Sequence, residues 1–177
     1  PQEVLGQDKP IALLGKKVKH HLFGLRTPVR PLTILFPGPT GIGKTELLMK
    51  MGLAADLPFF LIEGSQFGES HTLSRLIGSP AGYVDKSEGV LFRFVKDNNT
   101  GIIFFDELEK MHPDVVAGFM NFYDRARLTS GEGEVLERPG MIIVAASNAG
   151  AEKLHEGLTP REVKETLAEY FVDRFGN

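Results

Sequence analysis

The hydrophobic residues of this chain fall into short continuous runs, separated by stretches in which they recur at helical spacing. Four runs predict strands: “LTILF” at 32–36, “FFLIE” at 59–63, “GIIFFDE” at 101–107 and “GMIIVAASN” at 140–148. Because successive positions in these runs are apolar, both faces of each strand must be covered, which is typical of a parallel sheet.

Helical patterns lie before, between and after the predicted strands. Ile11, Leu14, Val18 and Leu22 recur at helical spacing and predict a first helix. Further helices are predicted over “TELLMKMGLAA” at 45–55, “HTLSRLI” at 71–77, “EGVLFRFVKD” at 88–97, “HPDVVAGFMNFYDRA” at 112–126 and “TPREVKETLAEYFVDRF” at 159–175. This alternation predicts an α/β fold with helices on both faces of the sheet, in which ligands bind beyond the carboxyl ends of the strands.

Composition narrows the class of protein. The 177 residues carry 42% hydrophobic and 24% charged positions and a net charge of −3, as in a soluble globular domain. This charge indicates neither nucleic acid nor an anionic membrane as a partner. The chain has no cysteine, and no apolar run approaches the ~20 residues of a membrane helix. Since “PQEVLGQDKP” lacks the features of a signal peptide and an initiating Met, we expect a cytoplasmic protein of which residues 1–177 are a fragment.

A phosphate-binding pattern follows the first predicted strand. “GPTGIGKT” at 38–45 matches G-x-x-x-x-G-K-[ST]. Its glycines let successive backbone N–H groups point at phosphate oxygens, and the helix that follows adds its positive dipole end. Lys44 can reach the β- and γ-phosphates, and the hydroxyl of Thr45 can ligate Mg²⁺. The alternative is a glycine-rich turn that binds nothing.

Polar residues also follow the third and fourth predicted strands. Asp106 would hold the Mg²⁺ shell, and Glu107 could polarise an attacking water. Ser147 and Asn148 follow the fourth strand, and Asn148 would lie near the γ-phosphate if that strand neighbours the first. The alternatives are a helix-capping pair of acids and a turn-forming asparagine.

Four segments together resemble a known family: “GPTGIGKTE”, “SRLIGSPAGYV”, “IIFFDELEKMHPDV”, and “RLT” followed by “IIVAASN”. They are similar to the AAA+ module of the Clp-type protein unfoldases and disaggregases, most of all to their second, C-terminal ATPase module. The resemblance spans nearly all of the chain. It implies a three-layer P-loop sandwich, the large AAA+ subdomain, over 1–177, with the fifth strand and the small helical lid domain missing from the chain.

The resemblance also implies cofactors and roles. ATP and Mg²⁺ would be bound, with Thr45 and Asp106 as metal ligands and with Glu107, Asn148 and Lys44 as catalytic residues. The nucleotide-binding set would be Val4 and Leu5 at the adenine, then Gly38, Pro39, Thr40, Gly41, Ile42, Gly43, Lys44, Thr45, Glu46 and Asp106. The segment “TSGEGEVLERPG” would form a further pore-facing loop or hairpin.

The stretch “GSPAGYVDKSEG” at 78–89 would contain the pore loop. Tyr83, with Gly82 and Val84, would grip a translocating polypeptide. Asp85 departs from the family's “GYVG”, which puts substrate preference in doubt. By the same alignment, the arginine that acts on the neighbouring subunit would follow Asn177.

The implied function is ATP hydrolysis that drives protein unfolding by threading polypeptide through a ring, which we expect to be a hexamer. A protease or co-chaperone is left open as a further partner, and the isolated fragment is expected to be a weak ATPase. Two alternatives stay open. One is another AAA+ machine, such as a helicase loader, clamp loader or transcription activator, and the other is a non-hydrolysing, nucleotide-dependent assembly module.

Overall fold

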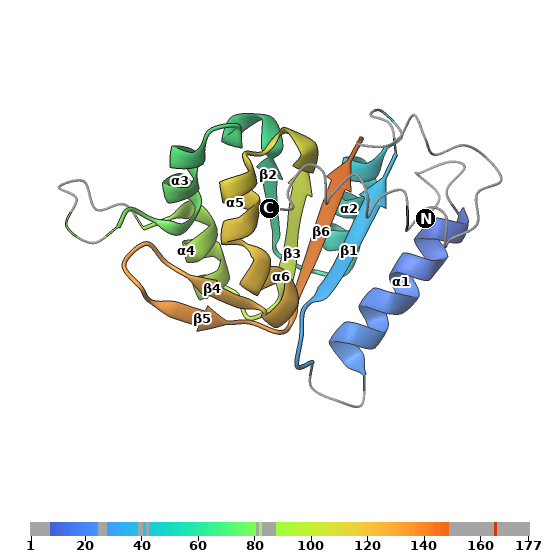
Figure 1. Ribbon diagram of the computed structural model, residues 1–177. Coiled ribbons are helices and arrows are strands. Elements are labelled where there is room, and N and C mark those ends of the chain that lie inside the picture. The colour runs from blue at the N-terminus through green and yellow to red at the C-terminus, as the bar shows by residue number, and fades with distance from the viewer. Residues whose placement is uncertain are drawn as a thin grey trace.

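A four-stranded parallel sheet forms the centre of the fold (Figure 1). This computed structural model describes residues 8–24, 28–38, 41, 43–80, 82, 88–148 and 165, to which all structural statements refer. The strands are β1 (Leu32–Pro37), β2 (Phe59–Glu63), β3 (Gly101–Asp106) and β6 (Met141–Ser147), in the order β1-β6-β3-β2. All three pairings are parallel, so the predicted strands and the predicted α/β class are confirmed.

Side chains of the two central strands alternate between two hydrophobic cores. Ile102 and Phe104 of β3 pack with Leu48 on one face, and Ile103 and Phe105 pack on the other. In β6 every residue is buried. This two-sided burial explains why the sequence of each central strand is apolar without interruption.

Helices cover both faces of the sheet (Figure 1). One face is covered by α1 (Asp8–Phe23) and α2 (Lys44–Ala54). The other face is covered by α3 (Leu73–Ile77), α4 (Val90–Asp97), α5 (Pro113–Gly118) and α6 (Met120–Arg125). Three short 3₁₀ turns lie at Gly64–Phe67 (η1), Ser70–Thr72 (η2) and Leu108–Lys110 (η3).

The single helix predicted over 112–126 is wrong, because the structure breaks it at Phe119. The backbone there (φ −100°, ψ 0°) leaves the helical range, and the ring packs 5.6 Å from that of Phe105. Residues on both sides of the break, such as Val115 and Phe122, are fully buried in the same core. The hydrophobic pattern therefore continues across the break and does not reveal it.

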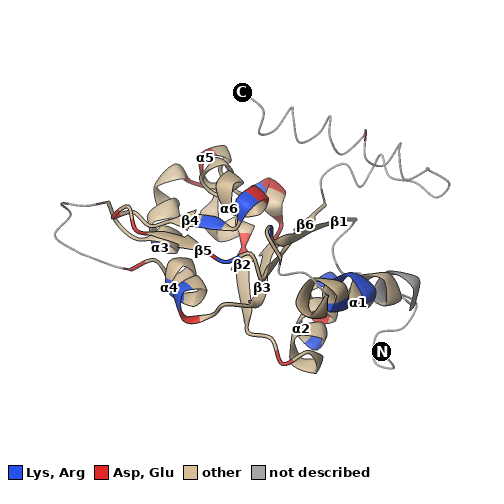
Figure 2. Ribbon diagram, turned by 90° about the horizontal axis from the view of Figure 1, so that it is seen from below, with Lys and Arg blue, Asp and Glu red and all other residues tan. Residues whose placement is uncertain are grey.

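A two-stranded antiparallel hairpin stands apart from the main sheet. It consists of β4 (Arg127–Thr129) and β5 (Val135–Glu137), with Leu128 opposite Leu136. The turn and the second strand of this hairpin lie in “TSGEGEVLERPG”, the segment for which the resemblance implies a pore-facing loop or hairpin. It lies beside α4, on the side of the molecule away from α1, where basic and acidic positions occur close together (Figure 2).

Several predictions fall outside the described residues, among them the terminal helix at 159–175, of which Glu165 alone is described, in helical conformation. Among the described helices, none has the length and apolar character needed to cross a membrane.

Candidate functional site

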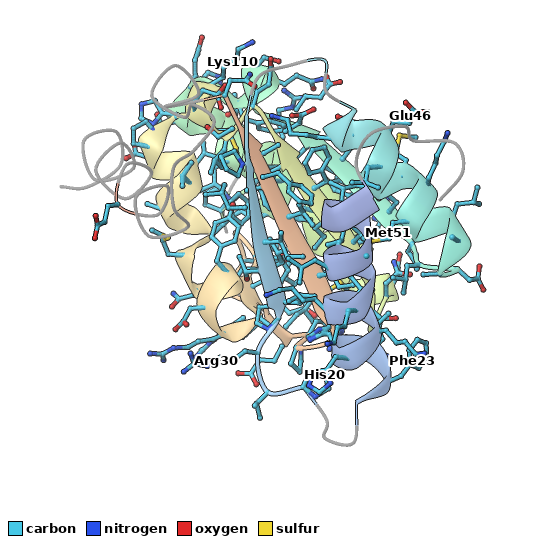
Figure 3. The ribbon with its side chains drawn as sticks, turned by 90° about the vertical axis from the view of Figure 1, so that its right-hand side faces the viewer. His20, Phe23, Arg30, Glu46, Met51 and Lys110 are labelled. Atoms are coloured by element: carbon cyan, nitrogen blue, oxygen red, sulfur yellow. The ribbon has the colours of Figure 1, made fainter. Side chains whose placement is uncertain are left out.

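Three chain segments meet at the carboxyl ends of β1, β3 and β6. Because β6 lies between β1 and β3, the residues that follow these strands are brought to one edge of the sheet. The backbone N–H of Gly38, just after β1, donates to the carbonyl of Ser147 at the end of β6 (3.1 Å). Glu46 and Lys110 mark this end of the molecule, and Phe23 and Arg30 mark the opposite end (Figure 3).

Two glycines of the loop after β1 have the kind of backbone conformation that its sequence pattern predicts. Gly41 and Gly43 adopt positive φ angles of 82° and 83°, and a Cβ atom at either position would meet no atom within 4 Å. Glycine is therefore required here for backbone conformation and not for lack of space. The loop turns directly into α2 at Lys44, which directs the positive end of the helix dipole toward this edge.

Lys44 connects the loop to β6. Its Nζ donates to the carbonyl oxygen of Gly38 (2.6 Å) and to Oδ1 of Asn148 (3.3 Å). Burial lowers the pKa of Lys44, while the carboxylates of Asp106, Glu109 and Glu107 act in the opposite direction. The ammonium group of Lys44 thus lies between the first residue of the phosphate loop and the residue that follows β6, where a cation can bind a phosphate.

Asp106 and Thr45 form a second pair at the same edge. Thr45 Oγ1 donates to Asp106 Oδ2 (2.9 Å), and the N–H of Glu107 donates to Asp106 Oδ1 (3.0 Å). One hydroxyl and one carboxylate are the donor set that Mg²⁺ takes when phosphates and waters supply the remaining ligands. The described residues contain no cluster of three or more acidic or histidine side chains that could hold a metal by themselves.

Glu107 has an unusual backbone conformation. Its φ of 53° is left-handed, and its backbone packs against Gly64, where a Cβ atom would clash with the carbonyl of Glu107 and lie 2.9 Å from that of Asp106. The Glu107 carboxylate accepts from Lys110 Nζ (2.7 Å), which raises the pKa of Lys110. The acid one residue beyond the strand is therefore held in place by both its backbone and its side chain.

The sequence alone did not indicate a role for two residues of this site, Glu109 and Lys110. Both lie on η3, which turns the chain back over the strand ends. Glu109 Oε2 accepts from Ser147 Oγ (2.8 Å) and from the N–H of Asn148 (3.3 Å). The signal in the sequence is their position three and four residues after Asp106, but a 3₁₀ turn cannot be read from that spacing.

The structure gathers most of the described residues of the predicted site. Around Lys44 and Asn148 lie Gly38, Gly41, Gly43, Thr45, Asp106 and Glu107. Glu46 is not part of this cluster, because its mostly exposed side chain pairs with Lys50 one turn along α2 (2.8 Å). Outside the described residues lie Val4, Leu5, Pro39, Thr40, Ile42, Tyr83 and Val84, whereas Gly82 is described and has a φ of 100°.

The sequence of this chain is similar to the sequences of known proteins. A family described as “AAA domain (Cdc48 subfamily)” matches residues 30–177. The chaperone protein ClpB of Meiothermus ruber is 38% identical over an alignment of 175 residues, and the alignment covers 95% of this chain and 20% of that protein. The Clp protease ATP-binding subunit ClpE of Streptococcus pneumoniae is 36% identical over an alignment of 180 positions, and the alignment covers 98% of this chain and 24% of that protein.

A solved structure is also similar. A closed-state cryo-EM reconstruction described as Hsp104 with ATPγS and FITC-casein matches with a TM-score of 0.83 and 30% identity, over 98% of this chain and 33% of that chain. The expected P-loop AAA+ fold and the resemblance to Clp-type modules are thereby confirmed. The chain spans only about a fifth of the length of the curated relatives named above.

Proposed function

Because this chain belongs to the AAA domain family, Cdc48 subfamily, we propose that residues 1–177 form the nucleotide-binding subdomain of an ATP-driven protein-unfolding machine. The observation that carries this proposal is the convergence of β1, β3 and β6 on Lys44. Its ammonium group lies between the phosphate-loop carbonyl of Gly38 and the side chain of Asn148.

Most described residues of the predicted site have a chemical role in this proposal. The loop N–H groups and Lys44 bind the phosphates of ATP, and Thr45 and Asp106 hold Mg²⁺. Mg²⁺ bound there neutralises charge that develops on the phosphates. The Glu107 carboxylate orients and polarises the attacking water. The side-chain amide of Asn148 contacts the γ-phosphate. Its Oδ1 atom already accepts from Lys44 Nζ, so this side chain lies beside the cation that binds the phosphates.

The mechanical part of the proposal rests on the relatives. Two of them are named as a chaperone protein and as a Clp protease ATP-binding subunit, and a third was reconstructed with FITC-casein. We propose that this chain likewise works in a cytoplasmic ring, a hexamer, that threads a polypeptide through its pore. Gly82, Tyr83 and Val84 would grip that polypeptide, and Val4 and Leu5 would contact the adenine.

The test uses the full-length protein that contains residues 1–177, which we call the parent. Glu107→Gln should retain ATP binding and lose turnover, because the amide cannot polarise the water. Tyr83→Ala should retain ATP hydrolysis and lose unfolding of a folded reporter protein. Glu69→Gln is the matched control, since Glu69 is exposed and pairs with His71 on η2, outside the site (3.3 Å).

The outcomes separate the proposal from its alternatives. Retained hydrolysis in Glu107→Gln would refute the role of Glu107. Unfolding that survives Tyr83→Ala would refute the gripping role. Salt-sensitive DNA binding by the parent would indicate a DNA-directed AAA+ machine instead. Tight ATP binding without turnover in the wild-type parent would indicate an assembly module.

A further inference from the structure

Glu109 extends from one strand end to the next. It lies on η3, two residues after Glu107, and its carboxylate reaches across to the end of β6. The proposed function assigns no role to this side chain.

Glu109 Oε2 accepts two hydrogen bonds at the point where β6 ends. The hydroxyl of Ser147 donates to it at 2.8 Å and the backbone N–H of Asn148 at 3.3 Å. Ser147 is 1% exposed, so its hydroxyl bonds within the protein and not with bulk solvent. Hydrogen bonds to a charged acceptor at a buried position are stronger than those between neutral groups.

Ser147 is held from a second side as well. Its carbonyl oxygen accepts from the N–H of Gly38, the first residue of the phosphate loop (3.1 Å). Ser147 therefore links the loop after β1 to the turn after β3. Because the backbone and the side chain of Ser147 are both hydrogen-bonded, the backbone position of Asn148, the next residue, is also restricted.

Asn148 is that following residue. Its N–H points to Glu109, and its side-chain Oδ1 accepts from Lys44 Nζ at 3.3 Å. The same residue is thus anchored through its backbone and directed through its side chain. Glu109 also contributes to the negative field at Lys44, where it acts against the burial that lowers the pKa of this lysine.

We infer that Glu109 is a positioning residue for Asn148 and keeps the end of β6 in register with Glu107. This inference rests on the proposed ATP hydrolysis. An asparagine that contacts the γ-phosphate and a glutamate that polarises the attacking water must both be positioned around the same phosphorus atom. Glu107 immediately precedes the η3 turn and Glu109 is its central residue, so one short element sets the positions of both carboxylates.

The expected effect is on turnover and not on ATP affinity. Glu109→Ala leaves the phosphate loop and the Thr45–Asp106 pair intact, so the Kd for a fluorescent ATP analogue should change by less than about twofold. The kcat should fall at least about tenfold, because misplacing a reacting group by ~1 Å can cost ~100-fold. Glu109→Gln, whose amide oxygen can still accept both hydrogen bonds, should recover part of kcat. Glu69→Ala serves as the control.

A second measurement does not depend on catalysis. Hydrogen exchange in the intact parent without nucleotide should show faster exchange of the Asn148 amide in Glu109→Ala, but not in Glu69→Ala. If the wild-type parent hydrolyses no ATP, the proposed function fails, while this measurement still tests the anchor. Unchanged exchange at Asn148 would overturn the inference. So would an unchanged kcat, equal kcat values for Glu109→Ala and Glu109→Gln, or a loss of ATP binding that matches the loss of turnover.

Discussion

The turn of the β4–β5 hairpin is fastened to the residues that precede the proposed pore loop, and the strength of this attachment can be predicted. The N–H of Gly131 donates to the carbonyl of Ile77 (2.9 Å). A Cβ atom at Gly131 would clash with the carbonyl oxygen of Gly78 and lie 2.6 Å from that of Ser79. Both obstacles are backbone atoms, so Gly131→Ala must push the turn away and break the hydrogen bond. Overpacking of this kind costs about 1–3 kcal/mol.

Lys96 makes a second attachment at the same place, through its charge. Its Nζ lies 3.1 Å from Glu134 Oε2 on the hairpin side and 3.4 Å from Glu88 Oε1 near the start of α4. All three side chains are substantially exposed, and such pairs are worth about 0.2–1 kcal/mol. The backbone contact of Gly131 should therefore dominate, and Lys96→Ala should weaken the attachment by less.

Native-state hydrogen exchange in the intact parent measures both attachments. About 2 kcal/mol corresponds to about 30-fold faster exchange, the change expected at amide 131 in Gly131→Ala, against at most about fivefold in Lys96→Ala. Gly15→Ala is the matched control, because a Cβ at this exposed position of α1 meets no atom within 4 Å. The reasoning is refuted if Gly131→Ala leaves this exchange unchanged, or if Lys96→Ala has the larger effect.

Two further substitutions test how Glu107 is held. Gly64→Ala should distort the backbone of Glu107, because the added Cβ clashes with its carbonyl, and we expect kcat to fall with a loss of about 1–3 kcal/mol in local stability by hydrogen exchange. Lys110→Ala should free the Glu107 carboxylate and raise basal kcat by at most about fivefold, since an exposed pair is worth up to about 1 kcal/mol. Steady-state ATPase assays decide both, and a lower kcat in Lys110→Ala would mean that Lys110 holds Glu107 in its working position.

The parts of this molecule that sequence could predict are those with a local pattern. The four strands are continuous apolar runs, and the phosphate loop has fixed spacing, so both were predicted at nearly the observed positions. Phe119 was placed inside a helix because its burial continues the helical pattern of Val115 and Phe122 across the break. Glu46 belongs to the quoted motif, yet helical geometry directs it along α2 toward Lys50.

The contacts that sequence could not predict depend on how segments distant in the chain meet. Glu109 contacts Ser147 across 38 residues, and Lys44 contacts Asn148 across 104 residues. Such pairs follow from the strand order, which places β6 between β1 and β3. The role expected for Asn148 depends on β6 being the neighbour of β1. The structure meets that condition, and it adds the Glu109 anchor, which no spacing rule contains.

Strand β6 runs from the hairpin to the candidate nucleotide site. It begins just after the hairpin, where the N–H of Met141 donates to the carbonyl of Arg138 (3.1 Å), and it ends at Ser147, next to Asn148. All its residues are buried, and a strand packed on both faces and paired on both edges moves as a unit more readily than it bends. Strand β6 is therefore a continuous buried connection between Asn148 and the hairpin. From the hairpin, the Gly131–Ile77 hydrogen bond continues this connection to the residues that precede the proposed pore loop.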